Sequence, residues 1–268
     1  MKKLMFVAAA ALCATVPCKA IESANVVGYT SVTLAADGYA LAAAQFQTTA
    51  SETMDANELV KSSVAKNSYN GDDYIAGWEE TAAKIQIRVG NTYETYYYCA
   101  DADNGAGGYV EGWADMDGYL VTKPLAPGKG FWLNNATDDN VTFTLAGQVI
   151  GTATANAAGT SGFNLVANPY PQGFNINSEG ITWNLTAQNS YNGDDYISGW
   201  ETSASAIQIR VGNTYETYYY CGDADNGAGG YVEGWADMDG YLVSKTIDAG
   251  CGFWIESKDN SFTAVFTK

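Results

Sequence analysis

The chain has 268 residues, of which 30 are acidic, 13 are basic and none is histidine. Without histidine there is no Ser-His-Asp or Cys-His nucleophilic site and no His-ligated zinc. The net charge of −17 argues against nucleic acid as a partner, because phosphate contacts are built from clustered lysine and arginine. Hydrophobic residues make up 47% of the sequence, which is ample for a packed core.

Residues 1–20 have the order of charge and hydrophobicity that is typical of a secretory signal peptide. Lys2 and Lys3 precede an apolar run over residues 4–16, and Ala20 is a small residue suited to cleavage. The run is too short to span a bilayer. Cleavage after Ala20 removes three lysines and no acidic residue, which takes the net charge from −17 to −20. We expect a secreted, extracellular or cell-surface protein without a membrane span, with the periplasm as an alternative.

The remainder of the chain contains one sequence twice. The segment that begins at Asn67 recurs at Asn189, an offset of 122 residues, with one difference over residues 67–79. Residues 85–121 also recur with one difference. Nearer the start of each copy the match is looser, and the boundary falls near Gly147. We therefore expect two tandem domains from an internal duplication, over residues 21–146 and 147–268.

Short strands separated by turns dominate the sequence pattern. Residues 85–89 alternate between apolar and polar, and an aromatic run over residues 93–99 follows a Gly-Asn-Thr turn. Such patterns are typical of an all-β fold, either a β-sandwich or an open barrel. The single expected helix covers residues 54–64. Further strands are expected over residues 26–34, 38–44, 118–122, 130–134 and 141–145.

The hairpin after residue 85 has two alternative registers. A three-residue loop pairs Arg88 with Glu94, whereas a two-residue loop puts Glu94 beside Ile87. We predict the first register because it keeps the carboxylate away from apolar neighbours. The inner face would then carry Ile85, Ile87, Tyr97 and Cys99, and the outer face Gln86, Arg88, Glu94, Tyr96 and Tyr98.

Two motifs resemble those of a known group of proteins. Residues 162–170 read G-F-N-L-V-A-N-P-Y, and residues 126–132 read A-P-G-K-G-F-W. They resemble a repeat of secreted, largely uncharacterised β-rich proteins of Gram-negative bacteria, in which a G-x-N-L-V-x-N-P strand opens the sandwich and a P-G-x-G-F-W strand comes late. The resemblance implies exported β-sandwich modules and carries no catalytic residues. The chain departs from the pattern at residues 44–46, where Asn-Pro is missing, and at Cys251, which replaces the equivalent of Lys129.

Three cysteines follow the signal peptide. Cys99 and Cys221 occupy the same position in the two copies, whereas Cys251 occurs only in the second. Because an exported protein favours paired cysteines, we predict a Cys221–Cys251 disulfide. Cys99 is then single, and we expect it to be buried as a small apolar side chain.

An acidic, glycine-rich segment over residues 101–118 recurs at residues 223–240. Alternating carboxylate and amide oxygens on a flexible loop are ligands that Ca²⁺ prefers. The spacing differs from an EF-hand, and Asp, Asn and Gly also form turns without metal, which is the interpretation we favour. The candidate calcium ligands are Asp101, Asp103, Asp115, Asp117, Asp223, Asp225, Asp237 and Asp239.

Aromatic side chains near these carboxylates suggest a sugar-binding surface, because flat rings pack against the CH faces of sugars. The alternative is that they fill the core, and we favour this alternative for the tryptophans. For the tyrosines of the hairpin, the binding and core interpretations are evenly balanced. The candidate ligand-binding residues are Tyr96, Tyr98, Trp78 and Trp113, with their copies Tyr218, Tyr220, Trp200 and Trp235.

These observations predict a non-catalytic binding or adhesion protein that contacts glycan through duplicated aromatic and acidic surfaces. Its expected partners are polysaccharide or other surface proteins. The main alternative is a self-associating structural component of a surface layer, fibre or matrix. Paired carboxylates hydrolyse glycosides without histidine, but no spacing here separates an acid from a nucleophile. We therefore do not expect an enzyme, and a glycoside hydrolase is the least favoured alternative.

Overall fold

The computed structural model describes residues 26–49, 51–71, 73–193 and 195–268. These residues are nearly all in strands and turns, which confirms the all-β prediction, and their sheets are open and not closed into barrels. The predicted signal peptide lies outside the described residues. Among the helices of the described segments, none has the length and hydrophobicity needed to cross a membrane. We refer to residues 26–149 as the N-terminal half and to residues 150–268 as the C-terminal half.

The N-terminal half has two main sheets that share one core. Its strands are β1 (Val27–Leu34), β2 (Tyr39–Ala43), β3 (Phe46–Gln47), β5 (Val60–Ser62), β8 (Ala83–Val89), β9 (Thr92–Asp103), β10 (Tyr109–Ala114), β12 (Gly130–Asn135) and β13 (Val141–Val149). One sheet has the order β1-β13-β3, with β5 also paired to β13, and the other has the order β10-β9-β8-β12-β2. Phe131 and Phe143 come from different sheets and are both fully buried in this core.

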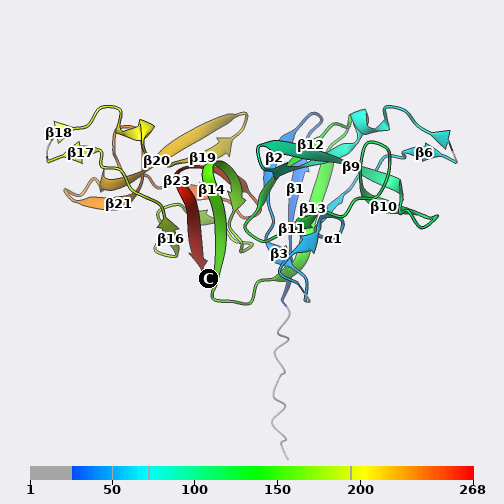
Figure 1. Cartoon of the computed structure of the whole chain (residues 1–268), viewed down its shortest axis with the longest axis horizontal. Helices are drawn as coiled ribbons and strands as arrows, with labels where there is room; N and C mark the ends of the chain where they lie inside the picture. The colour runs from blue at the N-terminus through cyan, green and yellow to red at the C-terminus, as the bar shows by residue number, and fades with distance from the viewer. Residues whose placement is uncertain (1–25, 50, 72, 194) are drawn as a thin grey trace, which may run out of the picture.

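The C-terminal half builds its core on one long sheet. Its strands are β14 (Thr154–Ala167), β16 (Ile181–Asn184), β19 (Ala206–Val211), β20 (Thr214–Asp225), β21 (Tyr231–Ala236) and β23 (Gly252–Thr267). The order is β14-β23-β19-β20-β21, with β16 also paired to β23. The halves lie side by side along the longest axis of the molecule (Figure 1).

Four pairs of short elements complete the two halves. The strands β4 (Met54–Asp55) and β11 (Pro124–Leu125) pair with each other, as do β15 (Phe174–Asn175) and β22 (Thr246–Ile247). Two small hairpins, β6 (Tyr69–Asn70) with β7 (Asp73–Tyr74) and β17 (Tyr191–Asn192) with β18 (Asp195–Tyr196), lie at opposite ends of the molecule (Figure 1). Each is followed by a short 3₁₀ helix, η1 (Trp78–Thr81) or η2 (Trp200–Thr202).

The first and last strands of the N-terminal half differ from those of the C-terminal half. In the N-terminal half, a turn at Asp37, with φ of 57°, separates β1 from β2. The amide of Asn135 donates to Leu34 O, Ala35 O and Asp139 O, and so ties the break between β12 and β13 to that turn. In the C-terminal half, β14 and β23 each run through the equivalent position without a break.

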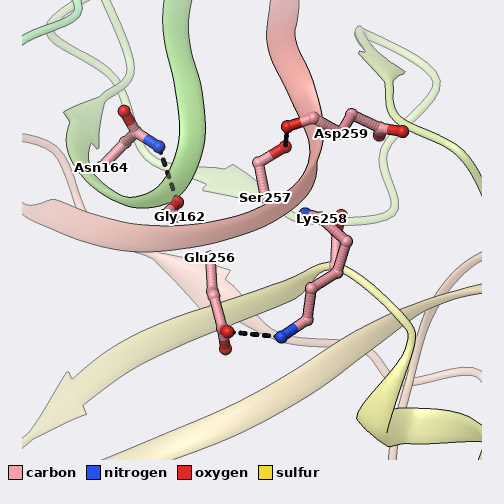
Figure 2. Close-up of polar contacts among 7 residues, drawn as sticks. Gly162, Asn164, Glu256, Ser257, Lys258 and Asp259 are labelled. Carbon is pink, nitrogen blue, oxygen red and sulfur yellow. Dashed lines mark hydrogen bonds and ion pairs between the residues drawn. The ribbon is translucent and has the colours of Figure 1, made fainter.

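The continuous strands of the C-terminal half change direction at a bulge. Their pairing shifts register between Thr160 and Gly162, and Gly162 has φ of 83°, a conformation that favours glycine. Figure 2 shows the contacts around it, where Asn164 donates to Gly162 O at 2.8 Å and Ser257 donates to Asp259 O at 3.2 Å. An ion pair between Lys258 and Glu256 flanks the bend. The strands of the C-terminal half therefore bend at this corner without a break. At the equivalent corner of the N-terminal half, the strands are interrupted.

Two predicted elements are shorter than expected. The helix predicted over residues 54–64 is a single turn, α1 (Ala56–Leu59), capped by the Asp55 carboxylate. It stays short because the residues on either side pair as β4 and β5. Residues 118–122 form no strand and make only isolated bridges, at Tyr119 and Leu120.

The predicted register of the β8–β9 hairpin is wrong. Val89 pairs with Thr92, and Ile87 pairs with Glu94, so the turn has two residues. Gly90 makes this turn possible because its φ is 60°. The carboxylate of Glu94 is not left among apolar groups, since Lys123 Nζ lies 2.8 Å from it. With this register, Tyr96 and Tyr98 face the main core together with Ile85.

The two halves are joined by backbone pairing and by one buried amide. Ala43 N donates to Gly250 O, and Ala167 N donates to Gly128 O, each at 2.9 Å. The side chain of Gln45 is fully buried, and its Nε2 donates to Asn168 O at 3.2 Å and Tyr170 O at 2.7 Å. Gln45 therefore links residues 44–46, where the N-terminal half lacks Asn-Pro, to the Asn-Pro segment of the C-terminal half.

The predicted Cys221–Cys251 disulfide is wrong. Both residues are free thiols, as is Cys99, within the part of the chain that the structure describes. Cys221 is buried in a small cluster with Trp200, whereas Cys251 lies at the junction, opposite Ala42 of the N-terminal half. Cys99 is buried as expected, but on the face of β9 that packs against Trp78 and not with Ile85.

Candidate functional site

The aromatic residues predicted to bind ligand are mostly inside the protein. Seven of the eight are buried, which agrees with the favoured interpretation for the tryptophans. The outer-face position predicted for Tyr96 and Tyr98 is wrong, because both lie in the main core. Tyr218 is half-buried, and burial with a hydrogen bond to Glu216 raises its pKa to about 12. The seven buried residues are Trp78, Trp113, Tyr96, Tyr98, Trp200, Trp235 and Tyr220.

The buried pair Tyr98 and Trp113 shows why these rings are not free to bind. Their ring centroids are 5.0 Å apart in an edge-to-face arrangement, and Trp113 Nε1 donates to Val60 O at 2.9 Å. Tyr98 OH donates to Glu111 at 2.6 Å. Burial and this hydrogen bond raise the pKa of Tyr98, so its phenol stays neutral. The pair is therefore part of the core that supports β9 and β10.

Other tyrosines form an exposed group around the acidic loop. We call Tyr69, Tyr74, Tyr109 and Tyr119 the N-terminal tyrosine surface. The ring centroid of Tyr69 lies 5.8 Å from that of Tyr74 and 5.4 Å from that of Tyr109. Tyr109 and Tyr119 are each 51% exposed. The rings thus gather at one end of the molecule with much of their area in solvent.

Strand register places a carboxylate between two of these rings. Tyr109 pairs with Asp103 across β10 and β9, and Asp103 in turn bridges to Tyr119. Residues directly opposite each other in a sheet project to the same side. Tyr109, Asp103 and Tyr119 therefore form a row on one face, with aromatic rings on both sides of the carboxylate.

Asp101 fixes the base of the tyrosine surface. Its Oδ1 accepts from Ser68 N at 2.6 Å and from Ser68 Oγ at 3.0 Å, and its Oδ2 accepts from Tyr69 N at 3.2 Å. Burial raises the pKa of Asp101, but these hydrogen bonds and one from the Cys99 thiol outweigh burial and hold the pKa below its usual value. The ionised carboxylate therefore holds the backbone of Ser68 and Tyr69 against β9.

The C-terminal half repeats this surface with the same residues. The C-terminal tyrosine surface consists of Tyr191, Tyr196, Tyr231 and Tyr241. The ring centroid of Tyr191 lies 5.8 Å from that of Tyr196 and 5.7 Å from that of Tyr231. Beside it is a cavity of about 230 Å³, whose lining residues are Asn189, Tyr191, Asn192, Gly193, Asp223 and Tyr231. This cavity combines aromatic faces, amides and a carboxylate, a set that suits a polar ring with hydroxyl groups.

Four of the eight candidate calcium ligands, Asp103, Asp115, Asp225 and Asp237, shape turns. Asp103 accepts from Gly105 N at 2.8 Å, and Asp115 accepts from Asp117 N at 3.0 Å and Tyr119 N at 2.9 Å. Asp225 and Asp237 make the equivalent bonds in the C-terminal half. Within the described ranges, no three or more Asp, Glu or Cys side chains are grouped as metal ligands. This geometry favours the turn interpretation, and calcium binding stays a prediction.

The sequence contains a signal for the tyrosine surface that strand alternation does not reveal. Tyr69, Tyr74, Tyr109 and Tyr119 lie in or beside Gly, Asn and Asp turns, within the segments that recur almost unchanged. Tyrosines in turns are held at the surface by the loop backbone. The turn context, and not the strand pattern, therefore marks the exposed rings.

Comparison with known proteins adds no relative. The chain matches no protein-family model, no curated protein and no solved structure.

Proposed function

We propose that the protein is a secreted or cell-surface, non-catalytic binding protein that contacts glycan through its two tyrosine surfaces. The observation that carries this proposal is the row of Tyr109, Asp103 and Tyr119, which recurs with the same residues in the C-terminal half. Exposed rings pack on the CH faces of sugars, while carboxylates and amides accept and donate hydrogen bonds to hydroxyl groups.

We further propose that the chain consists of two copies of a duplicated β-sandwich module, over residues 21–146 and 147–268, which correspond approximately to the two halves. The repeated sequence coincides with equivalent strands, since β8, β9 and β10 correspond to β19, β20 and β21. Each half also has its own buried core. A module that presents the same surface twice fits adhesion better than catalysis, because the carboxylates Asp103 and Asp115 are engaged by backbone N–H groups.

A glycan array with the mature chain tests this proposal, with one arm in Ca²⁺ and one in a chelator. We expect binding to at least one neutral or acidic polysaccharide, and we expect the double variant Tyr109→Ala with Tyr231→Ala to lose about tenfold or more in affinity, as removal of a stacking ring does. Tyr29→Ala is the control, because Tyr29 is 75% exposed on β1, outside the tyrosine surfaces. An array without any hit, or equal loss in the control, would contradict the proposal.

Assembly into fibres or layers is the second candidate. It is favoured by β10 and β21, which are the edge strands of their sheets in both halves. Each edge is partly closed, because the Asn57 amide accepts from Trp113 N and donates to Val121 O, and Asn177 does the same at β21. Electron microscopy of the purified protein separates the two functions, since ordered fibres would support assembly.

A further inference from the structure

A groove lies at the junction of the halves, outside the tyrosine surfaces. It has a volume of about 550 Å³ and lies between the β8–β9 turn, the loop over residues 126–130 and β14. Its lining includes Arg88, Asn91, Lys129, Thr160, Ser161 and Phe163. We call it the junction groove.

Arg88 enters the groove with part of its guanidinium unused. Its Cζ lies 5.2 Å from the centroid of the Trp254 ring, a cation–π contact across the junction. Within the described residues, its hydrogen bonds run from Nε to Gly90 O at 2.8 Å and from Nη2 to Asn91 Oδ1 at 3.4 Å. These bonds orient the side chain and leave Nη1 available to a ligand.

The equivalent arginine of the C-terminal half is closed off. Arg210 lies 5.2 Å from the Trp132 ring, in the mirrored contact, but its Nη1 also donates to Tyr39 O at 2.8 Å. The cavity beside Arg210 is smaller, at about 360 Å³. The two junction arginines thus occupy equivalent positions, and Arg88 is the one with a free donor.

Lys129 brings a second positive charge that has no counterpart in the other half, where Cys251 replaces it. Its backbone is held from both sides, because its carbonyl accepts from Ala44 N at 2.8 Å and the residue bridges to Val166. No ion pair or side-chain hydrogen bond of Lys129 is formed with the described residues. The ammonium is therefore placed at the groove by a fixed backbone and is free to meet an anion.

The acidic residue of the groove does not cancel these charges. The Glu94 carboxylate forms an ion pair with Lys123 Nζ at 2.8 Å and accepts a hydrogen bond from Tyr96 OH at 2.7 Å. The hydrogen bonds from Lys123 and Tyr96 lower the pKa of Glu94, so this group and Lys123 form a neutral pair. Arg88 and Lys129 remain as two unpaired cations on a protein whose net charge is −17.

We propose that the junction groove binds the carboxylate of an acidic sugar within a polysaccharide, at a site separate from the tyrosine surfaces. The carboxylate would lie between Arg88 Nη1 and Lys129 Nζ, since charge-assisted hydrogen bonds to such groups are strong. Phe163 is 44% exposed and offers a ring for the CH face of the sugar. The hydroxyls of Thr160 and Ser161 line the groove and suit the hydroxyl groups of a saccharide.

Calorimetric titration with a trigalacturonate, and with the same trisaccharide as its neutral methyl ester, tests the proposal. We expect the full mature chain to bind the acid, to bind the ester at least about tenfold more weakly, and to lose affinity for the acid as salt increases from about 0.05 M to about 0.5 M. Lys129→Gln is expected to lose at least about tenfold in affinity for the acid, and Lys129→Arg to retain binding.

Two controls keep this test separate from the proposed function. Arg210→Gln removes the equivalent arginine and is expected to leave the affinity for the acid unchanged, as is the Tyr109→Ala and Tyr231→Ala double variant. Equal binding of acid and ester, no binding of the acid at millimolar concentration, or equal loss in Arg210→Gln would each overturn the proposal. Binding of a hexaglutamate peptide at the affinity of the trigalacturonate would overturn the assignment to a sugar.

Discussion

The two halves present the same tyrosine surface on differently built frameworks. At the ends of the molecule, the residues and their ring distances are nearly the same. Near the junction, the N-terminal half interrupts its strands around Asn135, whereas the C-terminal half bends continuous strands at Gly162. The same surface therefore occurs with two different ways of turning the strands near the junction.

The largest expected effect comes from removing the core tryptophan of β10 or of β21. Trp113 and Trp235 are fully buried, so Trp113→Ala and Trp235→Ala should each reduce the free energy of unfolding by about 3–5 kcal/mol. Urea unfolding of the full chain measures both values. A loss below about 1 kcal/mol in either variant would mean that its half tolerates a cavity in its core.

Gln45→Met should weaken the junction between the halves. The substitution removes the donor to Asn168 O and Tyr170 O. Tyr170 O keeps its hydrogen bond from Gln172 N, so among the described residues the carbonyl of Asn168 is the one left unpaired, at an expected cost of about 1–3 kcal/mol. We expect calorimetry to resolve two unfolding transitions that overlap more closely in the unmodified protein. Gln47→Met, at a half-buried position of β3, should leave the melting profile unchanged. Identical profiles for both variants would show that Gln45 does not couple the halves.

Replacing the same two tryptophans by phenylalanine separates the frameworks. Trp113 Nε1 donates to Val60 O, whereas Trp235 Nε1 is buried without a hydrogen-bond partner in the described residues. In the C-terminal half, Trp183 Nε1 makes the comparable backbone contact, to Ile176 O. Trp113→Phe should therefore destabilise by about 1–2 kcal/mol more than Trp235→Phe. Equal losses in urea unfolding would argue that the indole N–H contributes little in either half.

Acid should weaken the base of both surfaces in the same way. The folded-state pKa of Asp101 and of Asp223 lies below the usual value of about 4, so their stabilising effect is complete above that pH and is lost as the pH falls through the folded-state pKa. Asp101→Asn and Asp223→Asn should lower the melting temperature near neutral pH and flatten its decline below about pH 4. A decline as steep as that of the unmodified protein would assign the acid sensitivity to other carboxylates.

The hairpin shows how far the sequence alone predicts this fold. Alternation over residues 85–89 correctly indicates a strand, and Gly90-Asn91 is a local signal for the two-residue turn that forms. No local pattern contains Lys123, which comes from a distant loop to neutralise Glu94. A carboxylate opposite Ile87 is costly only without that lysine, so the register could not be decided before the tertiary contacts were known.

The sequence predicts which residue types form the candidate site, but not which individual residues. The repeated acidic and aromatic segment indicates where the surface lies. Which of its rings are exposed and which are buried depends on the packing of the folded protein. Both faces of β9 are covered, one by the main core and the other by the segment that contains Trp78, so alternation along the strand cannot select the exposed tyrosines. Tyr109 and Tyr119 stay in solvent because they lie at the edge of the sheet, beside the acidic loop.

The opposite placement of the two small hairpins has a consequence for mixtures with polymers. Under the proposed function, a polysaccharide chain held at β6 would lie at the far end of the molecule from β17 (Figure 1). Since geometry disfavours simultaneous engagement of both ends by one short chain, each molecule would link two different chains and not clamp one. Turbidity should then rise to a maximum at an intermediate ratio of protein to polymer and fall when either component is in excess.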